Sequence, residues 1–195
     1  MGKIYYVMGK SSSGKDTIYK HLMKRHPRFR TIVPYTTRPI REGERDGVEY
    51  FFVDKERFRE MQEEEKVIEA RSYNTKCGIW TYFTADDGQI DLGKYDYLVI
   101  GTLVSYQALK DYFGTERLVP VYIEVEDGIR LTRALEREKC QEKPLYAEMC
   151  RRFLADEEDF SEENLKKAGI KKRFENIQLE DCLNEIEQYI RQETF

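Results

Sequence analysis

The segment GKSSSGKDT, at residues 9–17, combines glycine, hydroxyl, lysine and acidic side chains in a spacing suited to binding phosphate. Its two glycines let backbone N–H groups turn toward phosphate oxygens, and a helix that begins after the loop adds partial positive charge. Lys15 can reach the β and γ phosphates and offset the charge that spreads over them during phosphoryl transfer. An ordinary Gly/Ser-rich turn is the alternative. We expect a triphosphate site built from Gly9, Ser11, Ser12, Ser13, Gly14, Lys15, Asp16 and Thr17.

Asp16 stands where loops of this kind usually carry Ser or Thr, and Thr17 supplies a hydroxyl one residue later. Mg²⁺ dehydrates reluctantly, so we expect phosphates and water to hold most of it, with Thr17 as the protein's metal residue. Two roles stay open for Asp16. It contacts the ion through water, or it caps the following helix.

A second candidate phosphate site lies in the stretch YTTRPIREGERDGVEYFFV, at residues 35–53. Arg38 and Arg41 flank a proline there, and Tyr50 follows a glycine-punctuated segment. Because arginine binds phosphate bidentately, two guanidinium groups and a phenol make a suitable clamp for a phosphate dianion. Two arginines in a loop are also common on solvated surfaces, so these residues alone leave both interpretations open.

The elements that must position these residues alternate between strand and helix patterns. Strand-like runs cover residues 3–8, 48–53, 67–73, 79–84, 95–101, 117–125 and 172–176, and helical patterns cover 16–26, 55–65, 103–113, 127–139, 145–160 and 179–192. Such alternation predicts an α/β fold of the P-loop NTPase type, with a mostly parallel sheet flanked by helices. The segment from about residue 30 to 83 is richer in strands and is expected to form its own lobe.

Taken with the loop, the stretch after residue 35 resembles the guanylate kinase family, which carries the pattern T-T-R-x-x-R-x-G-E-x-x-G-x-x-Y after its phosphate loop. The matching residues are Thr36, Thr37, Arg38, Arg41, Gly43, Glu44, Gly47 and Tyr50. Weaker matches follow: VIEA at 67–70 aligns Glu69 with the family's base-reading Glu, RALER at 133–137 resembles the start of its lid, RRFLADEEDF at 151–160 resembles the helix beyond the lid, and FEN aligns Asn176 with a late Asn.

This resemblance implies transfer of the γ-phosphoryl group of ATP, with Mg²⁺, to a nucleoside monophosphate, by analogy GMP. It implies catalytic roles for Lys15, Arg41, Arg137 and Arg152, and ATP contacts from Arg133 and Arg137. It implies acceptor contacts from Arg38, Arg41, Tyr50 and Glu69, the last accepting from guanine N1–H and the 2-amino group. The chain would form one guanylate-kinase-like domain, 1–195, with a core (1–30, 84–130 and 160–195), an acceptor-binding lobe (about 31–83) and a helical lid (about 131–159).

The base-binding side departs from the family pattern. Pro34 replaces a serine that helps to read guanine, Cys77 and Ile79 replace a tyrosine and a hydroxyl residue, and Gly101 and Thr102 replace acids. Tyr82 could substitute for the missing tyrosine. Two alternatives therefore stay open: a kinase for another phosphorylated acceptor such as ribose 1,5-bisphosphate, to which an Asp after the loop lysine points, and a noncatalytic interaction module of this family.

Composition limits the partners and the compartment. The 195 residues carry a formal net charge of −4 with acids and bases interspersed, which argues against nucleic acid as a partner. No apolar run approaches the roughly 20 residues of a membrane span, and the N-terminus lacks a signal-peptide pattern. The four cysteines are widely spaced without a C-x-x-C pair, as in reduced cytoplasmic proteins. We expect a cytoplasmic enzyme with small nucleotide substrates and make no prediction of oligomeric state.

Overall fold

A computed structural model of the chain describes residues 2–75 and 78–193, so Cys77 lies outside the described residues. Its central sheet is four-stranded and parallel, with the strand order β6-β1-β7-β8. These strands are β1 (Ile4–Met8), β6 (Tyr97–Ile100), β7 (Leu118–Glu124) and β8 (Arg173–Glu175). β1 is thus enclosed by neighbours on both sides, which agrees with its being buried along its whole length.

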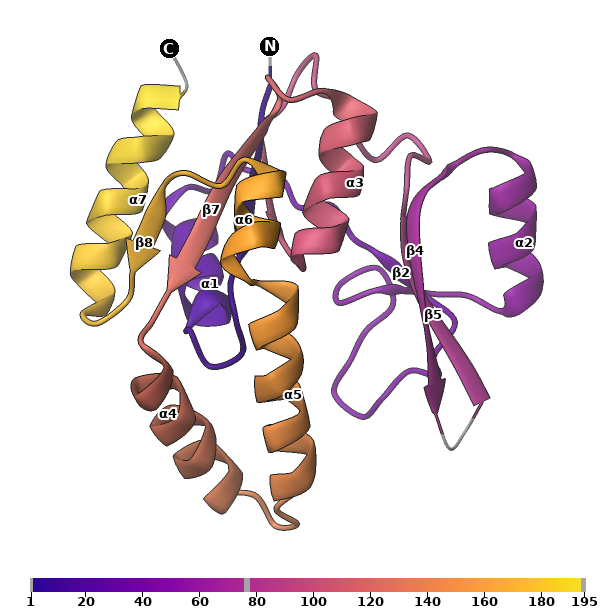
Figure 1. Cartoon of the computed structure of the whole chain (residues 1–195). Helices are drawn as coiled ribbons and strands as arrows, with labels where there is room; N and C mark the ends of the chain where they lie inside the picture. The colour runs from indigo at the N-terminus through magenta and orange to yellow at the C-terminus, as the bar shows by residue number, and fades with distance from the viewer. Residues whose placement is uncertain (1, 76–77, 194–195) are drawn as a thin grey trace.

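Helices cover both faces of the central sheet (Figure 1), and the alternation of side chains along β1 explains why. Tyr5 and Val7 point to one face, where α1 (Lys15–Arg25) and α7 (Leu179–Glu193) pack. The side chains between them point to the other face, where α3 (Leu103–Phe113) and α6 (Glu162–Ala168) pack. A strand apolar on both faces is the sequence signature of a parallel sheet buried between helices.

A second four-stranded sheet lies to one side of the central sheet, with the order β3-β2-β5-β4 (Figure 1). Its strands are β2 (Tyr35–Thr36), β3 (Phe51–Phe52), β4 (Val67–Thr75) and β5 (Gly78–Ala85). The helix α2 (Lys55–Glu63) closes a small separate core against it through Met61, which packs with Tyr35 and Phe83. This sheet falls within the segment expected to be rich in strands.

Two further helices, α4 (Asp127–Lys139) and α5 (Tyr146–Asp159), follow the end of β7 and pack against each other beside the loop that leads into α1 (Figure 1). Both are polar over most of their surface, and no residue of α5 is fully buried. No helix in the described part of the chain is long and apolar enough to cross a membrane.

The predicted α/β fold with a parallel sheet flanked by helices is confirmed. The expected strand over 48–53 is wrong in extent, because the strand β3 covers only Phe51–Phe52. The sequence pattern missed β2 and α6. β2 has only two residues, and α6 has seven, too few for a helical period to be visible.

Candidate active site

The loop between β1 and α1 has a shape that only glycine permits at two positions. Gly14 has φ +85°, a left-handed conformation, and a Cβ there would lie 2.3 Å from Asn176 Nδ2. A Cβ on Gly9 would lie 2.5 Å from the carbonyl oxygen of Ile123. The loop is therefore wrapped closely against the ends of β7 and β8, as a backbone cradle for an anion requires.

Asn176 fixes this loop from behind. Its buried Nδ2 donates to the carbonyl oxygen of Ser13 at 2.7 Å, and its backbone N–H donates to the backbone carbonyl oxygen of Glu124 at 3.0 Å. The hydroxyl oxygens of Ser12 and Ser13 are buried without a hydrogen-bond partner among the residues that the structure describes. Buried polar atoms almost always have partners. These two hydroxyls therefore fit a ligand that brings acceptor oxygens into the loop, as a phosphate does.

The end of the loop places Lys15 at the mouth of a cleft, with Nζ 3.7 Å from Asp16 Oδ2. The expected capping role of Asp16 is wrong, because the N-cap of α1 is Gly14 and no side chain caps the helix. Asp16 instead lies in the first turn, where a negative charge is favoured by the helix dipole. Asp16 and Thr17 are both exposed beside the loop, the position from which either could meet a hydrated ion.

On the other side of the loop, a pocket of about 110 Å³ separates it from α4 and α5. The structure brings Arg137 and Arg152 together here with Ser11 and Ser12 of the loop. Arg152 Nε donates to Glu148 at 2.9 Å, so its guanidinium is oriented by its own helix. Arg133 does not line this pocket.

Arg133 points back toward the core instead. Its Nη2 donates to the backbone carbonyl of Asn176 at 3.0 Å. Asn176 is thus hydrogen-bonded both to the loop, through Ser13, and to α4, through Arg133.

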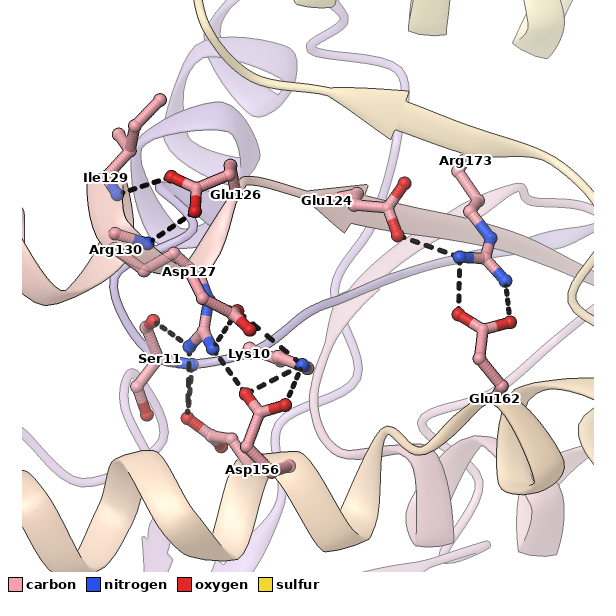
Figure 2. A network of polar contacts seen from close by, with 12 residues as sticks. Lys10, Ser11, Glu124, Glu126, Asp127, Ile129, Arg130, Asp156, Glu162 and Arg173 are labelled. Carbon is pink, nitrogen blue, oxygen red and sulfur yellow. Dashed lines mark hydrogen bonds and ion pairs between the residues drawn. The ribbon is translucent and has the colours of Figure 1, made fainter.

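A buried arginine couples the loop to α4 and α5 (Figure 2). Arg130 is only 1% exposed, and its Nη2 lies 2.6 Å from both Asp127 and Glu157. Its Nη1 donates to the carbonyl oxygen of Ser11 at 3.2 Å, while the N–H of Ser11 donates to Asp156 at 2.7 Å. The guanidinium lowers the pKa of Asp127 below its usual range. One cation therefore joins α4, α5 and the loop.

Two other cations, Lys10 and Arg173, form ion pairs in the same region (Figure 2). Lys10 Nζ lies 2.7 Å from Glu157, and Arg173 joins Glu124 on β7, at 2.9 Å, to Glu162 on α6, at 2.6 Å. Sequence reasoning missed this network. The one signal available was the position of Arg130, four residues before Ala134 on the inward face of α4.

The cleft that Lys15 enters has a volume of about 420 Å³ and lies between the two sheets. Tyr50, Tyr73 and Tyr82 line it from the second sheet and from the loop before β3. The Tyr82 ring centre lies 5.6 Å from that of Tyr50 and 5.9 Å from that of Tyr73. Burial raises the pKa of Tyr50, which keeps its phenol protonated as a donor. The structure thus places Tyr82 beside Tyr50. This position suits the expected substitution of Tyr82 for the tyrosine that Cys77 replaces in the family pattern.

The two arginines of the expected clamp lie outside the lining of this cleft. Arg38 is 3% exposed, and its two terminal nitrogens donate to the Glu44 carboxylate, each at 2.8 Å. This pairing lowers the pKa of Glu44 to about 2. The guanidinium lies 5.4 Å from the Tyr50 ring centre, whereas Arg41 is exposed and donates its backbone N–H to Glu44. Neither arginine lines the cleft.

Glu69 is also placed behind the cleft wall. Its Oε1 accepts from the Thr84 hydroxyl at 2.9 Å, and its Oε2 accepts from Arg71 Nε at 3.1 Å. Arg71 Nη1 donates in turn to the Thr102 hydroxyl at 3.1 Å. Arg71 is therefore the charged residue of β4 that lines the cleft. Thr84 of β5 and Thr102, at the start of α3, line it as well. Sequence reasoning missed Arg71, although the two-residue period of a strand places it on the face of Glu69.

The residues that depart from the family pattern divide into two groups. Pro34, Gly101 and Thr102 line the cleft, so these substitutions alter its walls directly. Ile79 is half exposed and does not line it. The replacement of a hydroxyl residue by Ile79 therefore does not change the lining of this cleft.

Comparison with known proteins agrees with the resemblance. Residues 1–80 match the family model described as guanylate kinase. A guanylate kinase of Trichodesmium erythraeum is 44% identical over 72 residues, 37% of this chain and 39% of that protein. One from Clostridioides difficile is 46% identical over 78 residues, 40% of this chain and 38% of that protein, and one from Neisseria gonorrhoeae is 41% identical over 99 residues, 51% and 46%. The match thus spans less than half the length of these relatives.

The crystal structure of guanylate kinase from Anaplasma phagocytophilum is similar to the whole fold, with a TM-score of 0.66 at 20% identity. The superposition covers 98% of this chain and 86% of that one. The guanylate kinase resemblance is therefore confirmed in sequence for the first 80 residues and in fold for nearly the whole chain.

Proposed function

We propose that this chain transfers the γ-phosphoryl group of ATP to GMP, forming ADP and GDP. One observation carries the proposal: Lys15, at the end of the phosphate loop, lines the same cleft as Tyr50 and Tyr82. A donor phosphate in the loop and an acceptor phosphate at the tyrosines would therefore meet beside one lysine. The names and the sequence match of the relatives support the choice of ATP and GMP.

On the donor side, the loop amides and the hydroxyls of Ser12 and Ser13 would bind the ATP phosphates. Lys15 would neutralise the charge that develops on the transferred group. Mg²⁺, when bound with ATP, supplies further positive charge at the phosphate oxygens and fixes their geometry. Thr17 and Asp16 are the residues of this chain beside that position.

On the acceptor side, the phenols of Tyr50 and Tyr82 would donate to the GMP phosphate. Arg38, fixed by Glu44, would add positive potential from behind the rings. Arg41 is exposed between β2 and β3 of the same lobe, residues 31–83, and would reach the phosphate when that lobe closes. Arg137 and Arg152 would approach from the lid, residues 131–159, because they already face the loop across a small pocket.

The reaction asks little covalent chemistry of these side chains. An oxygen of the GMP phosphate attacks the γ phosphorus of ATP, the bond to the β–γ bridging oxygen breaks, and ADP leaves with that electron pair. Catalysis then consists of alignment and charge neutralisation, with water excluded as a competing acceptor. Each of these tasks has a residue in or beside the two pockets.

A substrate panel tests the proposal. We expect ADP release from Mg-ATP to be fast with GMP and slow with AMP, UMP, CMP or ribose 1,5-bisphosphate. Rapid turnover of the sugar bisphosphate with none of GMP would assign the cleft to another acceptor. No turnover with any acceptor, in a protein that still binds ATP, would leave a binding module in place of a kinase.

A further inference from the structure

The base end of the acceptor cleft presents a cation at its surface and keeps the carboxylate behind it. The Arg71 side chain is 25% exposed and lines the cleft, whereas the Glu69 side chain is 5% exposed and does not. Both oxygens of Glu69 already accept hydrogen bonds from the protein, one from Thr84 and one from Arg71. Glu69 therefore acts on this cleft through the group that it holds.

The hydrogen bonds of Arg71 leave part of its guanidinium available to a ligand. An arginine side chain carries five N–H donors in a rigid planar arrangement. In Arg71 the Nε donor is bonded to Glu69, and one Nη1 donor is bonded to Thr102. The second Nη1 donor and both Nη2 donors have no such bond among the described residues. Two fixed points, on β4 and at the start of α3, set the plane of the group.

The rest of the cleft wall offers few rigid donors for a base. Pro34 has no N–H, and Gly101 has no side chain. Thr84 donates its hydroxyl hydrogen to Glu69, and the Thr102 hydroxyl accepts from Arg71. Apart from hydroxyl groups such as those of Tyr73 and Ser105, a base beside these residues thus meets one charged donor group, the Arg71 guanidinium, whose orientation is fixed by two hydrogen bonds.

We propose that Arg71 recognises the acceptor base by donating two hydrogen bonds to the O6 and N7 atoms of a 6-oxopurine, and that Glu69 and Thr102 are positioning residues for it. This inference rests on the proposed function. Arginine pairs bidentately with O6 and N7 of guanine, because its donors match the spacing of those acceptors. Adenine carries an amino donor in place of O6 and repels the guanidinium at that position.

The substrate class follows from this geometry. GMP and IMP share O6 and N7 and differ in the 2-amino group, which Arg71 does not contact. The cleft should therefore accept both, whereas a carboxylate that read N1–H and the 2-amino group would favour GMP strongly. The acceptor class is the 6-oxopurine nucleoside monophosphates.

Two analogues of GMP separate the two modes of recognition in the unmodified protein. We expect kcat/KM for IMP to lie within about 3-fold of that for GMP, and kcat/KM for 7-deaza-GMP, which lacks the N7 acceptor, to fall roughly 10-fold or more. A loss of about 100-fold with IMP, and none with 7-deaza-GMP, would overturn the inference and assign recognition to the 2-amino group. Failure of every monophosphate, GMP included, would instead overturn the proposed function.

Variants sharpen the test. Arg71→Lys keeps the charge but removes the two-pronged donor, so the ratio of kcat/KM for GMP over AMP should fall by roughly 10- to 100-fold, mainly through the KM of GMP. The KM of ATP should stay unchanged. Arg57→Lys, at an exposed arginine on α2, is the matched control. An unchanged GMP-to-AMP ratio in Arg71→Lys would contradict the proposal, and the analogue series stands if that variant does not fold.

Glu69→Gln distinguishes a positioning role from direct contact. If Glu69 only orients Arg71, kcat/KM should fall for GMP and IMP together, and their ratio should stay constant. If Glu69 contacts N1–H and the 2-amino group, the variant should lose more activity with GMP than with IMP, so the ratio of the two kcat/KM values should fall. The second pattern would refute the assignment of Glu69.

Discussion

The loop between β1 and α1 and the cleft between the two sheets are built by different means, although they meet at Lys15. The loop is shaped by backbone: a left-handed Gly14, a tight Gly9 and a carbonyl held by Asn176. The cleft wall and the layer behind it are organised by charged side chains that pair with one another: Arg71, in the wall, with Glu69, and Arg38, outside it, with Glu44. The backbone shape of the loop can be inferred from the positions of glycines along the chain, whereas the pairing of side chains depends on which segments become neighbours in the fold.

This difference explains where sequence reasoning succeeded. The spacing of Gly9, Gly14 and Lys15 was enough to identify the loop, because each residue acts through its own backbone or a single charge. The role expected of Glu69 in reading the base stays a prediction, because its side chain does not line the cleft, and its partner Arg71 was not recognised as part of the cleft. The comparison therefore predicts that variants of the loop and of the cleft will fail in different ways.

The largest effect is expected at the point where the two regions meet. Lys15→Ala should lower kcat on the order of 10³-fold, because it removes the cation aimed at the transferred group. Stability should change little, since the contact of Lys15 Nζ with Asp16 is long and largely exposed. Steady-state kinetics and a thermal melt measure both, with Lys20→Ala on the same helix as the control. Turnover within about 10-fold of the unmodified protein would remove Lys15 from the mechanism.

The next effect is on the coupling of the loop to α4 and α5. Arg130→Ala should lower the free energy of unfolding by about 3 kcal/mol, because it removes the buried guanidinium shared by Asp127, Asp156 and Glu157, although Lys10 still pairs with Glu157. Arg151→Ala removes an exposed ion pair with Glu148 and should cost less than about 1 kcal/mol. Urea unfolding of the two variants gives the comparison. Equal losses would show that the network in Figure 2 has no special weight.

A smaller effect is expected when glycines with positive φ are replaced, and two such glycines separate backbone strain from close packing: Gly43, outside the loop, and Gly14, within it. Gly43→Ala imposes φ +83° on a residue with nothing near its new Cβ and should cost about 1–2 kcal/mol. Gly14→Ala imposes a similar φ and also drives a Cβ against Asn176, so it should cost more and weaken ATP binding. Urea unfolding and ATP titration check this order. If both variants lose the same stability, the contact with Asn176 does not constrain the loop.

The smallest effect concerns the support of the cleft and depends on pH. The pKa of Glu44 is lowered to about 2 by Arg38, from an ordinary 4.5, so the pair stabilises the folded state above pH 4.5 and loses this contribution as pH falls toward 2. The difference in Tm between the unmodified protein and Glu44→Gln should therefore be full at pH 7 and reduced at pH 3. Glu63→Gln, at the end of α2, is the control. A gap that is constant with pH would contradict the ion pair.

Much of the fold could be predicted because its periodicity is local. The helices over 103–113 and 127–139 were predicted to the residue, since each shows an apolar face over several turns. The short helix α6 was missed, although Ser161 at its start and Gly169 at its end are ordinary capping residues. The network around Arg130 could not be predicted, because its partners come from α5 and the loop and meet only in the folded chain. The boundaries of the lobes and the lid stay a prediction.

The central claim is that one reaction joins the two regions, and transfer of label between the substrates tests it most directly. The protein would be incubated with Mg-ATP labelled in the γ phosphate and with unlabelled GMP, and the products separated by anion exchange. We expect the label to appear in GDP, with one ADP formed for each GDP. Label found only in inorganic phosphate, or kept in ATP, would contradict the account.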